Sequence, residues 1–429
     1  MIENLVKSIV NPLVNDLVPI NSSEYIFDFL SLQTSLTQSL IDLSAAYTRA
    51  GTKHLRQGGV YVAYGANAFG TDLDPVDVEY GYYSETAATN IWTYSTDFTN
   101  AVWVTNQTIG ASGDSAFSGG ASNTVGSSAV FGHKFIRPSI LAGSGVLSTF
   151  SFIVKAVGLR YVSIGRVTTT STVQTWVFDL QDGDIFQTPT SPDYTNGKIV
   201  SIGNGWYRIS VNVNSTTAAI RQCSLYMLSN TPTTPVTNDV SDFTGDGNTG
   251  ILISHAQLET GGRASSPIIT TSSTVTRAAD VLSLPTSSIA GFIAAQYSLI
   301  SHHICTDDLN GTCAASLNDG TGDNRLALTR NGATNDVNVY SGGSTVVSQL
   351  MGNGLIESKL GSSAIINNFL ASCNGVAGTA DVSAAMPIAP TTLNIGHNLG
   401  SNQLNGHLFE LALTTYAVTQ AQLNTETTL

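Results

Sequence analysis

Charged side chains are scarce in this sequence. Asp, Glu, Lys and Arg make up 11% of the 429 residues, whereas soluble domains usually contain about 25%. Acidic residues outnumber basic ones by 30 to 17, so the formal net charge is −13 at pH 7. Binding to nucleic acid depends on Lys and Arg side chains that neutralise phosphates. The composition therefore disfavours a nucleic-acid partner.

Long apolar runs and a secretion signal are also missing. No stretch approaches the roughly 20 apolar residues that a membrane helix requires, and the N-terminus lacks a basic start followed by a compact apolar run. We therefore expect a protein that is assembled in a cytoplasm and has no membrane partner. Ser, Thr, Asn and Gly replace the missing charges. Their hydroxyls and amides hydrogen-bond neutral partners such as sugars, and they suit chains that pack against copies of themselves, because a neutral amide is less costly to desolvate than a charge.

The four cysteines have no CxxC or metal-ligand spacing. The simplest interpretation is that Cys223, Cys305, Cys313 and Cys373 are small buried side chains in a reducing compartment. Cys305 and Cys313 are close enough in the sequence to lie across a short hairpin. One disulfide between them therefore stays open as an alternative.

The seven histidines do not form a recognisable metal site. His302 and His303 are adjacent in an expected strand, so their rings face opposite ways. His397 and His407 flank a turn, but no cysteine or carboxylate nearby completes a set of ligands. We therefore interpret the histidines as structural residues.

Recognisable catalytic motifs are absent, including GxSxG, HExxH and a phosphate-binding Gly-rich loop. Asp179, Asp182 and Asp184 lie in a turn, where Asp usually caps backbone N–H groups, whereas glycoside hydrolysis needs two carboxylates that face each other across a cleft. Asp242 and Asp246 lie in a second Gly-rich turn, whose oxygen atoms would suit calcium. We predict no cofactor and keep calcium at Asp242 and Asp246 as an alternative.

Residues 1–45 carry apolar side chains at helical spacing. Pro12 cannot lie inside a continuous helix, so we expect short helices rather than one long one. A stripe without an obvious partner in its own domain indicates docking or oligomerisation, and packing on an adjacent domain is the alternative. The residues that we predict to anchor the chain are Ile2, Val6, Ile9, Leu13 and Leu17.

From residue 46 onward, short runs of alternating polar and apolar residues are separated by Gly, Asn and Asp turns about ten residues apart. This pattern is typical of antiparallel sandwiches. We predict a mainly β protein with tandem antiparallel β-sandwiches of the jelly-roll type, preceded by a short α-helical N-terminal anchoring region. The expected divisions are a helical docking or oligomerisation region (1–45), a β lead-in or hairpin region (46–90), a first sandwich (91–285) and a second sandwich (286–429).

Three segments resemble a known family of domains. They are ETAATNIWTYSTDFTNAVW (85–103), GNGWYRISVNV (203–213) and HAQLETGGRASSPIITTSSTVTRAADVLSL (255–284). Together they resemble the carbohydrate-binding-module-like β-sandwich that is common in bacteriophage virion proteins, especially tail fibres and other appendages. The last 35 or so residues resemble the end of a concanavalin-A-like, laminin-G-type domain. The matching positions there are Gly396, Asn405, Gly406, Glu410 and the short helical segment 419–423.

Aromatic residues of the first sandwich are the candidate carbohydrate-binding groups. Trp206 and Tyr207 are neighbours on an expected strand, so they point to opposite faces, and an exposed ring could stack on a sugar. We name Trp206, Tyr207 and Trp176. The alternative for Trp206 is that it fills the core while Arg208 pairs with a local carboxylate. Three further residues in the lead-in and exit motifs are interpreted as junction ion pairs or capping groups: Arg49, Arg277 and Asp280.

The resemblance implies a structural component of a bacteriophage particle rather than an enzyme. A tail fibre or other appendage subunit in the virion fits best, joined to other virion proteins through the N-terminal helices. It would be a homo-oligomer, with a trimer favoured, and would project its sandwiches toward host-surface glycan. A capsid decoration, cement or head-fibre protein is the alternative. A tail-borne polysaccharide depolymerase is less favoured, because the sequence has no long parallel β-helix repeat.

Overall fold

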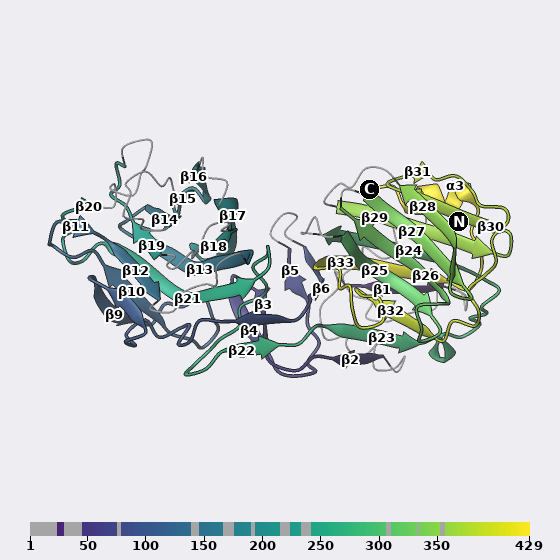
Figure 1. Cartoon of the computed structure of the whole chain (residues 1–429), viewed down its shortest axis with the longest axis horizontal. Helices are drawn as coiled ribbons and strands as arrows, with labels where there is room; N and C mark the ends of the chain where they lie inside the picture. The colour runs from purple at the N-terminus through teal and green to yellow at the C-terminus, as the bar shows by residue number, and fades with distance from the viewer. Residues whose placement is uncertain are drawn as a thin grey trace. The chain divides into compact units, whose positions relative to one another are not determined.

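The structure is a computed structural model of the chain, shown in Figure 1. It describes residues 24–29, 45–74, 79–138, 146–165, 176–189, 194–214, 224–232, 242–305, 310–332, 334–351 and 357–429. The chain divides into two compact units, each assembled from segments that are not contiguous in the sequence. Unit 1 contains Met1–Arg49, Asn67–Thr86 and Ala279–Leu429, and unit 2 contains Ala50–Ala66 and Ala87–Ala278. The predicted lead-in, residues 46–90, thus supplies strands to both units.

Unit 2 contains two six-stranded antiparallel sheets. The β13 sheet has the order β17-β18-β13-β21-β10-β9, and its strands are β9 (Thr108–Ser112), β10 (Ser122–Gly126), β13 (Ser148–Val157), β17 (Tyr194–Gly203), β18 (Trp206–Val213) and β21 (Gly250–Thr260). The β14 sheet has the order β16-β15-β14-β19-β12-β8, and its strands are β8 (Trp103–Thr105), β12 (Phe135–Pro138), β14 (Tyr161–Gly165), β15 (Trp176–Asp179), β16 (Asp184–Gln187) and β19 (Ser224–Met227).

Alternation along these strands builds the core of unit 2. Phe152 of β13, Val162 of β14 and Ile209 of β18 are fully buried and belong to one apolar cluster that draws side chains from both sheets. Because successive side chains of a strand point to opposite faces, the residues between them form the outer faces of the sheets. The described part of unit 2 also contains three two-stranded sheets: β3 (Lys53–Gln57) with β4 (Val60–Tyr64), β7 (Ala88–Asn90) with β22 (Val275–Arg277), and β11 (Gly132–His133) with β20 (Asp242–Phe243).

Unit 1 also contains two antiparallel sheets. The β24 sheet has eight strands in the order β31-β30-β29-β24-β33-β6-β5, with β1 also paired to β33. They are β1 (Glu24–Asp28), β5 (Asp72–Leu73), β6 (Tyr80–Ser84), β24 (Gln296–Cys305), β29 (Glu357–Ile365), β30 (Asn368–Cys373), β31 (Val376–Ala377) and β33 (Gly406–Thr414). The β25 sheet has the order β2-β23-β32-β25-β26-β27-β28, with β2 (Ala46–Thr48), β23 (Val281–Pro285), β25 (Asn310–Asn318), β26 (Arg325–Asn331), β27 (Thr334–Ser341), β28 (Ser344–Met351) and β32 (Thr392–Ile395).

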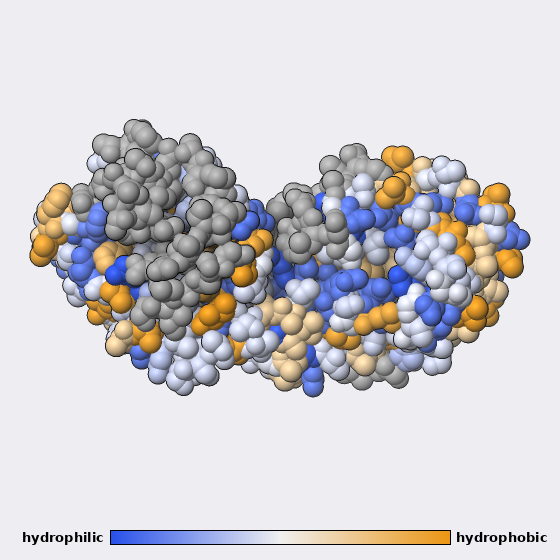
Figure 2. All heavy atoms as spheres, in the orientation of Figure 1, coloured by the Kyte–Doolittle hydropathy of each residue, from blue (hydrophilic) through white to orange (hydrophobic). Residues whose placement is uncertain are grey.

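Side chains from both sheets of unit 1 meet in one core. Leu299 of β24, Leu317 of β25 and Leu411 of β33 are fully buried members of this apolar cluster. On the face shown in Figure 2, exposed hydrophobic residues lie in small groups among hydrophilic ones. The mainly β, antiparallel character predicted from the alternation is confirmed.

Among the described residues of unit 1 there are two short helical elements, the 3₁₀ helix η2 (Thr286–Ser288) and the helix α3 (Gln420–Glu426). The predicted C-terminal helix is confirmed in α3. It begins at Thr419, whose side chain accepts a hydrogen bond from the Gln422 backbone N–H, while the Gln422 side chain accepts one from the Thr419 backbone in return. This reciprocal pair is a capping box, which fixes the start of a helix.

The predicted helical N-terminal region is wrong where the structure describes it. Glu24–Asp28 forms the strand β1, and each of its residues pairs with β33 in the register Glu24↔Thr414 to Asp28↔Glu410. Tyr25 and Phe27 pack on the unit 1 core and alternate with Ile26, which is the side-chain pattern of a strand. The apolar positions at helical spacing lie on either side of this segment. The predicted anchoring residues Ile2, Val6, Ile9, Leu13 and Leu17 lie outside the described residues. Among the described residues, no helix is long and apolar enough to cross a membrane.

Candidate glycan-binding surface

Trp206 is a core residue, which is the alternative that the sequence left open for it. It is 0% exposed, and it shares an apolar cluster with Tyr61 and Phe117 on the outer face of the β13 sheet. Its indole Nε1 donates a hydrogen bond to Asp114 Oδ1 at 3.1 Å, and the other oxygen of that carboxylate lies 2.7 Å from Lys155 Nζ. The ring therefore has no face open to a sugar, and Trp206 is corrected from a candidate ligand group to a core residue.

The hairpin β3–β4 explains this burial. Tyr61 of β4 hydrogen-bonds through its backbone to residues 116 and 118 and stacks on Phe117 with ring centroids 5.5 Å apart. At the hairpin tip, a Cβ on Gly203 would lie 2.6 Å from the Gly59 Cα, so the two turns touch only because both residues are glycines. A segment far from Trp206 in the sequence thus covers this face of the sheet.

Tyr207 and Trp176 are half-buried and face the apolar cluster between the two sheets. Both rings lie against glycines. A Cβ on Gly197 would come within 2.2 Å of Trp176 Cε3, and a Cβ on Gly183 would come within 2.8 Å of Tyr207 Cε1. These contacts cover part of each ring, so Trp176 and Tyr207 close the edges of the core. For Arg208, the sequence predicted pairing with a local carboxylate. In the structure its guanidinium instead donates hydrogen bonds to the Ser265 carbonyl and to Ser151 Oγ.

The turn predicted as an alternative calcium site is closed by its own hydrogen bonds. Asp246 Oδ1 accepts from the backbone N–H of Asn248 at 2.8 Å and from that of Thr249 at 2.7 Å. These bonds lower the pKa of Asp246, the bond from Thr249 most. The backbone of Asp242 pairs with His133 in the β11–β20 ladder, and its side chain is outside the described part of the chain. Within the described ranges, no group of three or more His, Cys, Asp or Glu side chains is arranged to hold a metal ion.

The outer face of the β14 sheet carries a row of aromatic residues that the sequence interpretation did not single out. Tyr161 and Tyr226 form a second apolar cluster there with Val177 and Leu228, and Phe135 packs against it. The strand register sets Tyr226 beside Phe135 and Ser163, while the neighbours Val162 and Ile164 point into the core. This sheet therefore has an aromatic outer face as well as an apolar inner face.

The exposed end of this row consists of five residues that we call the Tyr161–Phe186 platform. The rings of Tyr161 and Phe186 are 4.7 Å apart and tilted by 50°. Phe186 lies on the edge strand β16 and is 38% exposed, whereas Tyr161 is 8% exposed. The Arg160 guanidinium carbon lies 5.1 Å from the centre of the Tyr161 ring. Asp179 and Asp182 complete the platform.

Arg160 binds both carboxylates of the platform. Its Nε lies 2.8 Å from Asp179 Oδ1 and 2.7 Å from Oδ2, and its Nη2 contacts both Asp179 and Asp182. Burial alone would raise the pKa of Asp179, but the bonds from Arg160 and from the backbone N–H groups of Gln181 and Asp182 outweigh it and lower that pKa. The platform thus combines an accessible ring with ionised oxygens that accept hydrogen bonds. These are the groups that stack on and hydrogen-bond a sugar.

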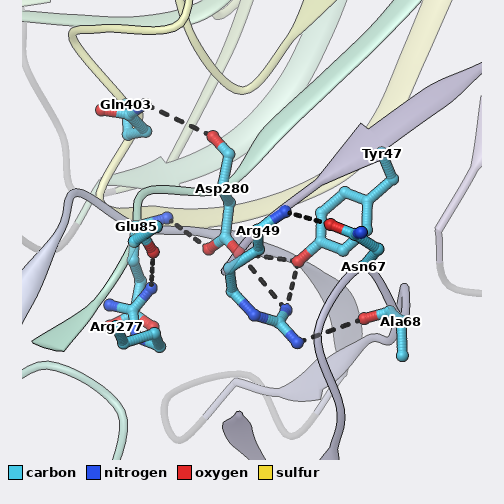
Figure 3. Close-up of polar contacts among 9 residues, drawn as sticks. Tyr47, Arg49, Asn67, Ala68, Glu85, Arg277, Asp280 and Gln403 are labelled. Atoms are coloured by element: carbon cyan, nitrogen blue, oxygen red, sulfur yellow. Dashed lines mark hydrogen bonds and ion pairs between the residues drawn. The ribbon is translucent and has the colours of Figure 1, made fainter. Parts of the chain in front are cut away.

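Unit 1 contains a buried ion pair where the sequence predicted one (Figure 3). Arg49 Nη1 lies 3.5 Å from Asp280 Oδ1, and both side chains are 0% exposed. The same oxygen accepts a hydrogen bond from the Tyr47 hydroxyl at 2.6 Å, and Oδ2 accepts one from the Glu85 backbone N–H at 3.0 Å. Both charged side chains of this cluster are closed off from solvent, so they offer no ligand site. Arg277 lies in unit 2, where its Nη1 donates to the Ala278 carbonyl at 3.0 Å.

The histidines have separate partners. As predicted, His302 and His303 face opposite sides of β24: His302 Nε2 lies 2.7 Å from Glu357 Oε1, while His303 is buried beside Ser301. His397 Nε2 lies 2.9 Å from the Leu282 carbonyl. His407 lies between two carboxylates, with Nε2 3.1 Å from Asp72 and Nδ1 3.3 Å from Asp74.

The structure does not contain the alternative disulfide. Cys305, Cys313 and Cys373 are buried and are not linked in a disulfide. The Cys305 thiol donates to the Leu404 carbonyl and that of Cys313 to the Ala315 carbonyl. Burial raises the pKa of Cys313 to about 12, so this thiol is unreactive at neutral pH. Cys223 lies outside the described residues.

Comparison with known proteins finds similarity only to solved structures, and each match that we describe covers about a third of the chain. No protein-family model matches the chain, and no curated protein matches it. Among solved structures, it is similar to the CBM40 carbohydrate-binding module of a Ruminococcus gnavus IT-sialidase, with 12% identity over 31% of this chain and 83% of that one and a TM-score of 0.28. It is similar to domain 4 of AbnA, a GH43 extracellular arabinanase from Geobacillus stearothermophilus in complex with arabinotriose (15% identity, 35% and 73% covered, TM-score 0.28).

A third similar structure is the NanB sialidase from Streptococcus pneumoniae, with 15% identity over 33% of this chain and 26% of that one and a TM-score of 0.28. These matches each span about a third of the chain. They do not assign a ligand to it.

Proposed function

We propose that this protein is a bacteriophage appendage subunit, of the tail-fibre type, that attaches to host-surface glycan through the Tyr161–Phe186 platform of unit 2. The platform carries the glycan part of the proposal, because a partly exposed ring, a guanidinium and hydrogen-bond acceptors meet there. The phage part is supported by the motifs of residues 85–103, 203–213 and 255–284. Homo-oligomerisation and attachment to other virion proteins belong to the same proposal.

The proposal does not include catalysis. Glycoside hydrolysis requires one protonated carboxylic acid beside a second carboxylate. In the platform, Asp179 and Asp182 share one arginine, and this favours the ionised form of Asp179. Such a surface binds and releases a saccharide without providing the acid that cleaves it.

Substitution of Phe186 tests the glycan part of the proposal. We expect the whole protein to bind host-surface polysaccharide and Phe186→Ala to lose about tenfold in affinity, since an aromatic stacking contact contributes about 0.5–1.5 kcal/mol beyond its buried area. Phe131→Ala is the matched control, because Phe131 also lies in unit 2 and is 68% exposed. Titration calorimetry gives the affinities. Equal loss in both variants, or no loss in Phe186→Ala, would contradict the assignment of the platform.

The composition of purified phage particles tests the structural part. We expect the chain to be present in virions at a fixed small copy number, as measured by quantitative mass spectrometry of particles banded on a density gradient. A copy number that matches the capsid lattice would favour the decoration or cement alternative. Absence of the chain from banded particles would refute the phage proposal altogether.

A further inference from the structure

A third carboxylate lies beside the Tyr161–Phe186 platform. Asp184 is exposed on β16, and the strand register places it directly opposite Asp179. With Asp182, which is 55% exposed, this places three carboxylates beside the guanidinium of Arg160. The local formal charge of these four groups is therefore −3 + 1 = −2.

Arg160 is already occupied. Its Nε and Nη2 are bound to the two carboxylates of Asp179 and Asp182. Recognition of an acidic sugar by arginine usually uses two parallel N–H groups of one guanidinium for one carboxylate. An acidic ligand would have to displace an internal carboxylate to gain that geometry.

The other described arginine of this sheet face is too distant to compensate. Arg137 is on β12 and lies over the Phe135 ring, with 5.2 Å between the guanidinium carbon and the ring centre. In the strand order, β12 is four strands from β16, which corresponds to about 19 Å at about 4.8 Å per strand. This exceeds the Debye length of about 8 Å at physiological salt. The charge of Arg137 is therefore screened from an acidic sugar stacked on Phe186.

We infer that the saccharide bound at the platform is uncharged, and that sugars carrying a carboxylate or sulfate are rejected. This inference rests on the proposed function and specifies its ligand class. A neutral sugar places its apolar C–H face on Phe186 and donates hydroxyl hydrogens to the free lone pairs of the carboxylates. An anionic sugar meets a net repulsion from these same oxygens. At effective dielectric constants typical of a protein surface, we expect it to bind at least about fivefold more weakly.

Paired glycans test the inference. The full chain is titrated with a neutral oligosaccharide and with its sialylated or uronic-acid counterpart, at 0.05 M and 0.5 M NaCl. We expect binding of the neutral member to be independent of salt, and binding of the acidic member to be weaker at low salt than at high salt, because salt screens the repulsion.

Removal of the carboxylates provides the second arm. Asp184→Asn, and the double variant Asp182→Asn with Asp184→Asn, should raise the ratio of acidic-glycan affinity to neutral-glycan affinity by about twofold and fivefold, because each change removes a negative charge while the amide oxygen still accepts a hydrogen bond. The control Asp323→Asn removes an exposed carboxylate in unit 1 and should leave this ratio unchanged. Tighter binding of acidic glycans by the native chain overturns the inference and leaves the proposed function standing. Failure to bind any glycan overturns the proposed function itself.

Discussion

Replacement of Trp206 by Ala separates a core residue from a ligand residue. The ring is 0% exposed and packs with Tyr61 and Phe117, so its removal leaves a cavity. Truncation of a buried Trp costs about 3–5 kcal/mol, and the lost bond from Nε1 to Asp114 adds about 1 kcal/mol. We therefore expect Trp206→Ala to lower the free energy of unfolding of unit 2 by about 4–6 kcal/mol, a large part of the total for a typical domain.

Tryptophan fluorescence is the suitable assay, because all four tryptophans lie within Ala87–Ala278 of unit 2. Three of them, Trp92, Trp103 and Trp176, remain as reporters in the variant. With a urea slope of about 3 kcal/mol per molar, the midpoint should fall by roughly 1.3–2 M. The exposed control Phe131→Ala should leave it nearly unchanged. A loss of stability below about 1 kcal/mol, or loss of glycan binding with an unchanged midpoint, would refute the burial argument.

Three further predictions concern stability. Burial lowers the pKa of His303 to about 3, so below pH 6.5 the unfolded state takes up a proton that the folded state does not. This histidine should therefore lower the free energy of unfolding of unit 1 by about 1.4 kcal/mol per pH unit from pH 6.5 toward 3. His303→Gln should reduce the pH slope measured by amide exchange by that amount, and an unchanged slope would contradict the prediction. Asp280→Asn should lower the free energy of unfolding of unit 1 by about 3–5 kcal/mol in a denaturant titration, because it removes the carboxylate charge that pairs with the buried Arg49 guanidinium. A cost near zero would show that water reaches the guanidinium. Gly197→Ala should displace the Trp176 ring, because the new Cβ would lie 2.2 Å from it. The free energy of unfolding of unit 2 should fall by about 1–3 kcal/mol. An unshifted tryptophan emission spectrum would argue against this contact.

Much of the strand content could be predicted from alternation alone. The segment FSFIVKAV lies in β13 and WYRISVNV forms β18, because their inward positions are apolar and β-branched or aromatic residues favour strands. The hairpin between β17 and β18 also has a clear signal in the sequence. Asn204 and Gly205 both have positive φ, 53° and 77°, which is the turn that an Asn-Gly pair favours between two strands. Local chemistry determines these features.

Features that depend on distant pairing could not be read in this way. Nothing near Trp206 indicates that β3–β4, some 145 residues earlier, covers its face of the sheet. Likewise, Tyr25, Ile26 and Phe27 favour a strand by residue type, but nothing near them indicates that their partner strand is β33, close to the other end of the sequence. One part of the platform could be predicted from the sequence. The Asp-Gly turn at Gly183 indicates that β15 and β16 form a hairpin. That signal did not place Phe186 beside Tyr161, which reaches it from β14.

The interleaved order of segments also has a mechanical consequence. The described strands nearest the two ends, β1 and β33, pair with each other in unit 1, and the unit 2 segments lie between them in the sequence. Tension applied at residues 24 and 414 acts on one end of this antiparallel ladder, so it opens the five residue pairs of β1 in sequence. Until that ladder opens, the force path does not enter unit 2. A glycan held on unit 2 would therefore experience little of a load carried between these two points.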